Sequence, residues 1–134
     1  MSNKKLYPRT AKNNLVSIVI PCYNEEKNIN RTIDGLLEEE KNCKYKFEII
    51  AVNDGSKDAT WDVIKSYAEK YPNVIGVNQM GNFGQSQAYQ AGFDIAKGDY
   101  VLICSADLET PLKHIIEIVE KLDEGYDFVN TNRK

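Results

Sequence analysis

The chain has 134 residues, which is enough for one domain with a single hydrophobic core. Hydrophobic residues make up 42% of it and charged residues 28%, so an intrinsically disordered chain is excluded. The formal net charge of −3 provides no attractive field for nucleic acid, so nucleic acid is not expected as a partner.

Residues 1–14 are polar and aperiodic and are predicted to form an N-terminal leader, which leaves one domain over residues 15–134. The basic side chains of the leader favour a solvated tail, with contact to a membrane surface as the alternative. No signal peptide is predicted, and no apolar run approaches the roughly 18 residues of a membrane span. The cysteines Cys22, Cys43 and Cys104 have neither zinc-site nor disulfide-framework spacing. We therefore expect a cytoplasmic protein, with the cytoplasmic face of the membrane as its alternative location.

Short β-branched runs alternate with helical periods along the domain, which is typical of βαβ units and a parallel sheet. The predicted strands are residues 15–20, 47–52, 74–77, 100–104 and 126–129. The fourth of these is apolar throughout and is therefore predicted to be central. The sequence thus predicts an α/β fold in three layers, α/β/α, with a mostly parallel, Rossmann-like central sheet.

Helices are predicted between the strands from apolar residues at helical spacing. Asn24 is the predicted N-cap of the first helix, and Asp58 is the predicted cap of the second. The third is predicted over residues 85–96, and the fourth opens at Pro111 and ends at Gly125. The residues of the third helix that are predicted to face the sheet are Ala88, Ala91, Gly92 and Ile95.

Polar, turn-rich sequence follows three strands, at residues 21–26, 53–56 and 105–107, and each run contains an acidic residue. Ligands of open parallel sheets bind beyond the carboxyl ends of the strands. Any one of these residues alone is better explained as part of a turn or cap. Three acidic ends at one edge favour a site for a hydroxyl-rich, metal-chelated ligand, because carboxylates accept hydrogen bonds from hydroxyl groups and bind hard cations.

The sequence lacks the motifs of other common nucleotide-binding sites. No GxGxxG motif follows the first strand, so the dinucleotide-binding fingerprint is missing, and no GxxxxGK[ST] motif is present, which excludes a P-loop. The single histidine, His114, is expected at the surface of the last helix rather than as a general base.

The run Ser17–Glu26 (SIVIPCYNEE), followed by Val52–Asp58 (VNDGSKD), resembles the opening of the family 2 glycosyltransferases. Asn82–Ser86 (NFGQS) and Ala106–Leu108 (ADL) make it similar to the branch that transfers sugars to polyprenyl phosphates. Dolichol-phosphate mannosyltransferases belong to that branch. The resemblance covers Leu15–Arg133, which is nearly the whole chain.

This resemblance implies a GT-A fold and an inverting transfer from a nucleotide diphosphosugar, with Mg²⁺ or Mn²⁺ as cofactor. The implied acceptor is a polyprenyl phosphate or another glycan of the cell envelope. By resemblance, Asp54 holds the nucleoside and Asp107 ligates the metal that bridges the two phosphates. The base and ribose pocket is implied at Pro21, Tyr23 and Glu25, and the remaining implied contacts to the nucleotide sugar are Asn82, Ser105 and Ala106.

Ser105 departs from the family pattern, because it stands where the first aspartate of the DxD motif is usual. A hydroxyl is a poorer ligand than a carboxylate, and Glu109 is the candidate helper for the metal. Family members continue with an acceptor-binding segment, so the C-terminal part of the fold is expected to be missing, and no catalytic residue can be assigned. The alternative to an enzyme is a truncated, non-catalytic module that binds a nucleotide sugar or an interaction partner.

Overall fold

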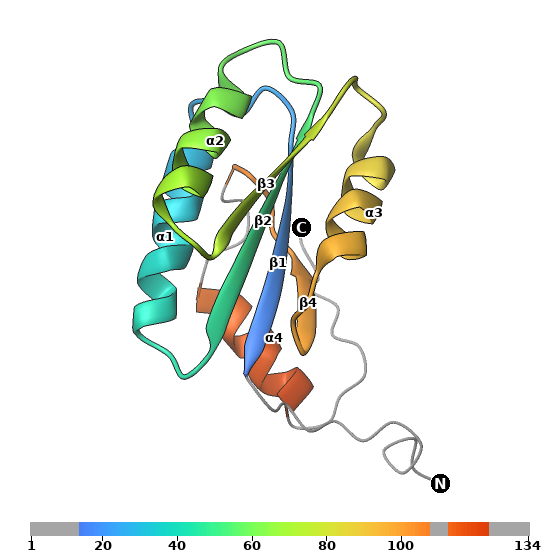
Figure 1. Ribbon diagram of the computed structural model, residues 1–134. Coiled ribbons are helices and arrows are strands. Elements are labelled where there is room, and N and C mark those ends of the chain that lie inside the picture. Colours follow the sequence, from blue (N-terminus) through green and yellow to red (C-terminus); the bar gives the residue numbers. More distant parts are fainter. Residues whose placement is uncertain (1–13, 108–112, 124–134) are drawn as a thin grey trace, which may run out of the picture.

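The computed structural model describes residues 14–107 and 113–123 (Figure 1). Four parallel strands form one sheet in the order β3-β2-β1-β4. The strands are β1 (Leu15–Cys22), β2 (Lys46–Asp54), β3 (Val74–Gln79) and β4 (Tyr100–Ile103). The helices are α1 (Ile29–Lys41), α2 (Thr60–Lys70), α3 (Gln85–Ile95) and α4 (Lys113–Asp123). This arrangement confirms the predicted α/β class.

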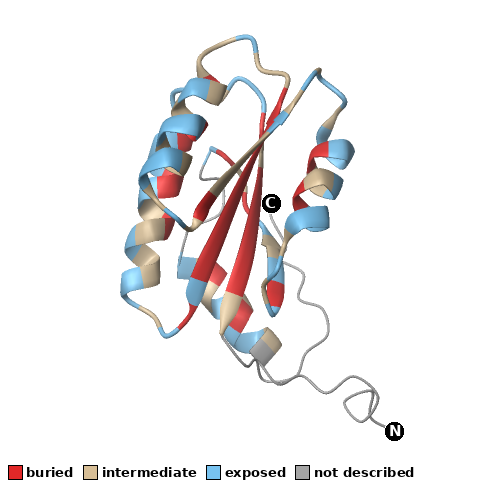
Figure 2. Ribbon diagram, in the orientation of Figure 1, coloured by how far each residue is buried: buried red, intermediate tan, exposed pale blue. Residues whose placement is uncertain are grey.

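The core lies on both faces of the two central strands, β1 and β2, which Figure 2 shows as almost wholly buried. Successive residues of a strand point to opposite faces, so each strand contributes to two clusters. Ile18 and Ile49 pack with residues of α1, α2 and α4 on one face. Val19 and Ile50 pack with Ala88 of α3 on the other. The three layers therefore consist of α1, α2 and α4, the sheet, and α3.

Small residues let α3 approach the sheet closely, as the sequence predicts. Ala88 is fully buried, and a Cβ atom added at Gly92 would lie 2.4 Å from Cγ1 of Val19. The prediction that Ile95 faces the sheet is wrong, because its side chain is exposed at the last turn of the helix.

Three strands run further than predicted, and β3 extends two residues past the predicted end, to Gln79. β1 continues through Pro21 to Cys22, and β2 continues through Asn53 to Asp54, because the neighbouring strands offer partners that far. Cys22 pairs with Asn53 in the register of β1 and β2, and Asp54 pairs with Gln79 of β3. Asn53 and Asp54 therefore belong to the sheet and are held more rigidly than turn residues would be.

The prediction that Asn24 caps α1 is wrong. Asn24 has a positive φ of 55°, and α1 begins after Asn28. Asp58 does act at the start of α2, because its Oδ1 accepts the backbone N–H of Thr60 at 2.9 Å. The backbone N-cap of that helix is nevertheless Ala59.

The prediction that β4 is central is wrong for the described sheet, in which β4 is an edge strand. Val101 and Ile103 remain 42% and 49% exposed, since α3 lies over β1 and β2. The predicted strand 126–129 and the predicted helix ends Pro111 and Gly125 lie outside the described residues. Among the helices that are described, none has the length and apolar character needed to cross a membrane.

Candidate functional site

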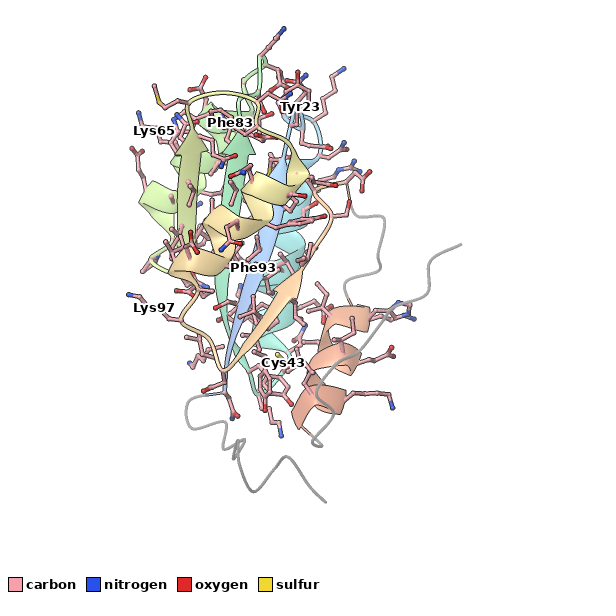
Figure 3. All side chains as sticks on the ribbon, turned by 90° about the vertical axis from the view of Figure 1, so that its right-hand side faces the viewer. Tyr23, Cys43, Lys65, Phe83, Phe93 and Lys97 are labelled. Carbon is pink, nitrogen blue, oxygen red and sulfur yellow. The ribbon has the colours of Figure 1, made fainter. Side chains whose placement is uncertain are left out.

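The polar runs predicted from the sequence meet at one end of the sheet. Because β1, β2 and β4 are parallel neighbours, their carboxyl ends lie at the same edge. The structure therefore brings Glu25, Asp54 and Asp107 to that edge, together with the loop that follows β3. Figure 3 shows Tyr23 and Phe83 at this end of the molecule, whereas Lys97 lies toward the other end.

The loops after β1 and β2 are fastened to each other by hydrogen bonds. The backbone N–H of Asn24 donates to Oγ of Ser56 at 2.9 Å, and Oδ1 of Asn24 accepts the N–H of Lys57 at 2.9 Å. The N–H of Glu25 donates to Oγ1 of Thr60 at 2.8 Å. These polar side chains form hydrogen bonds with backbone groups of a neighbouring loop, so the two loops hold each other in place. We call residues 24–26 and 56–60 the platform.

Asp58 and Glu26 strengthen this platform by a reciprocal pair of contacts. Asp58 Oδ2 accepts the N–H of Glu26 at 3.3 Å, and Glu26 Oε1 accepts the N–H of Ala59 at 3.1 Å. Burial acts to raise the pKa of Asp58, but the hydrogen bonds from Thr60 and Glu26 outweigh it and lower the pKa below its ordinary value. Asp58 is therefore a carboxylate at neutral pH and holds the loops in that form.

The residues expected to line the base and ribose pocket lie along β1 and its loop. Pro21 is half-buried within the strand, and Tyr23 is 41% exposed at its end. The carboxylate of Glu25 accepts a hydrogen bond from Nδ2 of Asn28 at 3.1 Å, just before α1 begins. Tyr23 is thus the aromatic residue among the three, and its ring is accessible, whereas Glu25 is hydrogen-bonded to the residue that precedes the helix.

Asp54 holds the loop that follows β3 by two hydrogen bonds. Its Oδ1 accepts the N–H of Phe83 at 2.8 Å, and its Oδ2 accepts the N–H of Gly84 at 3.1 Å. The side chain of Asn82 also accepts from Gly84, at 3.2 Å. Asp54 is only 5% exposed, yet a carboxylate has about four lone-pair sites, so two remain for a ligand. The sequence predicted a nucleoside contact for Asp54 and missed this positioning role.

Asp54→Asn is expected to raise the amide exchange rates of Phe83 and Gly84 by about tenfold. The amide nitrogen of asparagine cannot accept a hydrogen bond, and the other bond loses its charge. Hydrogen exchange followed by NMR measures the effect. Asp99→Asn is the matched control, because Asp99 Oδ2 accepts the backbone N–H of Leu15 at 3.0 Å at the opposite end of β1. Equal exchange rates of Phe83 and Gly84 in both variants would contradict the role of Asp54 in holding this loop.

Ser105 and Asp107 form the candidate metal site after β4. Ser105 Oγ donates a short hydrogen bond to Oδ1 of Asp107, and Asp107 is exposed. Between them, Ala106 is buried, and its carbonyl accepts from Oγ1 of Thr32 at 2.8 Å. Glu109 lies outside the described residues.

The donor atoms of Ser105 and Asp107 are hard oxygens, and within the described ranges no cluster of three acidic, histidine or cysteine side chains could hold a metal by itself. Mg²⁺ is commonly held by one or two carboxylates together with phosphate oxygens of a substrate. These two residues therefore fit a divalent cation that is shared with a bound phosphate.

The thiols near this edge are unsuited to nucleophilic chemistry. Burial, with a smaller contribution from Glu25, raises the pKa of Cys22 far above its ordinary value. Burial and then the charge of Asp107 raise the pKa of Cys104 to about 12. Both groups are therefore neutral thiols at physiological pH. His114 lies at the surface of α4 beside Glu117, as expected.

Residues 17–134 match the family described as "Glycosyl transferase family 2". The chain belongs to this family. It is 43% identical over 119 residues to an uncharacterized glycosyltransferase of Synechocystis sp., which covers 89% of this chain. It is 38% identical over 122 residues to the undecaprenyl-phosphate 4-deoxy-4-formamido-L-arabinose transferase of Proteus mirabilis, which covers 90% of it. The chain spans 37% of the length of each relative.

Solved glycosyltransferases of the GT-A type share the fold. The mannosyltransferase PcManGT from Pyrobaculum calidifontis, in complex with GDP-Man and Mn²⁺, is 28% identical with a TM-score of 0.60, over 69% of this chain and 27% of that one. S. aureus TarS 1–349 in complex with UDP is 25% identical with a TM-score of 0.62, over 79% of this chain and 32% of that one. The architecture described above is therefore that of a GT-A glycosyltransferase.

Proposed function

We propose that this domain binds a nucleotide diphosphosugar at the carboxyl ends of β1, β2 and β4. We further propose that it serves an inverting transfer to a polyprenyl phosphate at the cytoplasmic face of a membrane. The observation that carries the proposal is the placement of Glu25, Asp54 and Asp107 on one rigid edge of the sheet. The relative from Proteus mirabilis, named as an undecaprenyl-phosphate sugar transferase, supports the choice of acceptor.

In this proposal, the base and ribose lie against Pro21, Tyr23 and Glu25. Tyr23 offers an exposed ring for stacking, and the carboxylate of Glu25 accepts from ribose hydroxyls. Asp54 holds the nucleoside through its remaining lone pairs while it fixes the loop at Asn82.

The diphosphate lies over Ser105, Ala106 and Asp107 in this proposal. Asp107 and Ser105 would hold Mg²⁺ or Mn²⁺ there. When bound, the cation supplies positive charge that stabilises the departing nucleoside diphosphate. The role of these residues is to orient the donor, so that the anomeric carbon faces the acceptor oxygen.

A second candidate function is a nucleotide-sugar-binding module without turnover. Ser105 favours it, because a hydroxyl in place of the usual carboxylate leaves one acidic ligand after β4 within the described residues. The two candidates differ in one measurement. Release of the nucleoside diphosphate in the presence of undecaprenyl phosphate and Mn²⁺ supports the transferase, and binding without release supports the module.

Asp107→Ala is expected to abolish the metal-dependent part of nucleotide affinity. Because Asp107 would hold the cation whose charge offsets that of the diphosphate, the wild-type chain should bind UDP or GDP about tenfold more tightly with Mn²⁺ than without it, the effect of about one charge-assisted contact. Isothermal titration calorimetry with both nucleotides and their sugars measures this ratio.

Asp94→Ala is the matched control for Asp107→Ala, because Asp94 is an exposed carboxylate on α3, where its Oδ1 accepts a hydrogen bond from Nε2 of Gln90 at 2.8 Å. The control should keep the full Mn²⁺ effect. A wild-type chain that binds no nucleotide with or without the metal would refute the donor site, and a metal effect that survives in Asp107→Ala would refute the role of Asp107.

A further inference from the structure

We infer that Thr32 of α1 is a positioning residue for the turn that carries Ser105 and Asp107, an inference that rests on the proposed function. Oγ1 of Thr32 donates to the backbone carbonyl of Ala106 at 2.8 Å, across 74 residues of sequence. Both partners are buried, with exposures of 0% for Thr32 and 4% for Ala106. A hydrogen bond shielded from water in this way restrains geometry more strongly than an exposed one.

A threonine hydroxyl has one proton, so Thr32 can donate to only one acceptor at a time. The carbonyl of Asn28 lies 3.3 Å from Oγ1, the usual back-bonding contact within a helix. That carbonyl already accepts the backbone N–H of Thr32 at 3.1 Å. The shorter contact, to Ala106, is therefore the one that uses the proton.

Thr32 holds the turn formed by Ser105, Ala106 and Asp107, which we call the metal turn, at its middle residue. The sheet ladder of β4 ends with the N–H of Cys104, which donates to the carbonyl of Val19 at 2.9 Å. Two residues further on, the side chain of Ala106 packs in the core, while Asp107 is exposed. The hydrogen bond from Thr32 thus fixes the backbone between Ser105 and Asp107, and with it the direction of their oxygens.

The β-branched side chain of Thr32 suits this role. Threonine has few χ1 rotamers in a helix, and α1 is anchored by Ile29 and Ile33, which are fully buried on either side of it. The helix and the metal turn are therefore coupled through a side chain with little freedom to move. Shifts of the turn relative to the platform are resisted by the helix itself.

Thr32→Val tests the inference, because valine keeps the shape and removes the hydroxyl proton. The affinity for UDP or GDP with Mn²⁺ should fall by roughly twofold to tenfold, the effect of one hydrogen bond, while the affinity without metal stays unchanged. Thr32→Ser keeps the hydroxyl and should restore the Mn²⁺ effect. In an Asp107→Ala background, Thr32→Val should cause no further loss, because the two changes act on one interaction.

Amide exchange of the ligand-free chain provides a readout that needs no nucleotide. Thr32→Val should speed exchange at Ser105, Ala106 and Asp107, and Thr32→Ser should restore it. Ser66→Ala is the control, because Ser66 Oγ donates to the carbonyl of Val63 at 2.8 Å on the exposed side of α2.

Two results would overturn the role of Thr32: unchanged exchange at the turn in Thr32→Val, or a metal effect that is equal in Thr32→Val and the wild-type chain. A wild-type chain without metal-dependent nucleotide binding would refute the proposed function instead. In that case, the exchange measurement would still decide whether Thr32 fixes the turn.

Discussion

Gly55→Ala is expected to lower the free energy of unfolding by about 3 kcal/mol, from backbone strain and steric overlap together. Gly55 has a φ of +68°, a region that L-residues with a side chain rarely adopt. An added Cβ would also lie 2.5 Å from the backbone N of Asn82 and 2.5 Å from the backbone C of Gly81. Backbone atoms cannot turn aside as a flexible side chain can. Urea denaturation followed by circular dichroism measures the loss.

Gly81→Ala is the matched control for this substitution. Gly81 lies in the same pair of facing loops, but its φ is not positive, and the nearest atom to its added Cβ would be Cζ of the Phe83 ring at 3.4 Å, which is ordinary contact. We expect a change within about 0.5 kcal/mol. If Gly55→Ala were as mild as the control, the loops after β2 and β3 would not approach each other as closely as described.

The sequence was sufficient to predict the layers and to group the residues of the candidate site at one end of the sheet. β1 and β2 are buried on both faces, so each contains an apolar run that is easily recognised, residues 18–21 in β1 and residues 49–52 in β2. The parallel topology then places every strand's carboxyl end together. Glu25, Asp54 and Asp107 could be grouped on that basis, without any knowledge of their contacts.

The contacts themselves depend on tertiary packing and could not be predicted. Asn24 is a residue type that often caps helices, yet its side chain accepts a hydrogen bond from the backbone N–H of Lys57 in another loop. Asp54 follows an apolar strand as a turn residue would, but pairing with β3 keeps it in the sheet. The sequence gives no signal for the role of Thr32, because its partner Ala106, in the turn after β4, comes near only in the folded chain.

Apolar composition also failed to predict which strand is central. The run Tyr100–Ile103 has the residues of a buried strand, but burial depends on which elements cover it. α3 lies over β1 and β2, so Val101 and Ile103 are left exposed in the described part of the chain. Ile95 shows the same dependence on packing. Its position in the helix predicts contact with the sheet, but its side chain is exposed at the end of α3.

Glu48→Ala is the second substitution with a large expected effect, a loss of about 3 kcal/mol in the free energy of unfolding. Glu48 is buried in β2, where its Oε1 accepts the hydroxyl of Ser17 at 2.6 Å and the backbone N–H of Lys97 at 2.9 Å. Ser17 Oγ in turn accepts the N–H of Gly98 at 2.8 Å. Alanine leaves the hydroxyl and the Lys97 N–H without an acceptor inside the protein. Denaturant unfolding measures the cost.

Glu48→Gln separates the acceptor from the charge. Its amide oxygen can take the place of Oε1 and accept both bonds, so its loss should be about 1 kcal/mol, the difference between charged and neutral acceptors. A glutamine variant as unstable as the alanine variant would show that the charge, rather than the acceptor, matters. Glu48 pairs with Ser17 near the start of β1, and Lys97 lies far from Tyr23 and Phe83 (Figure 3). Both variants should therefore bind nucleotide as the wild-type chain does while they remain folded, because this network lies at the end of the sheet opposite the candidate site.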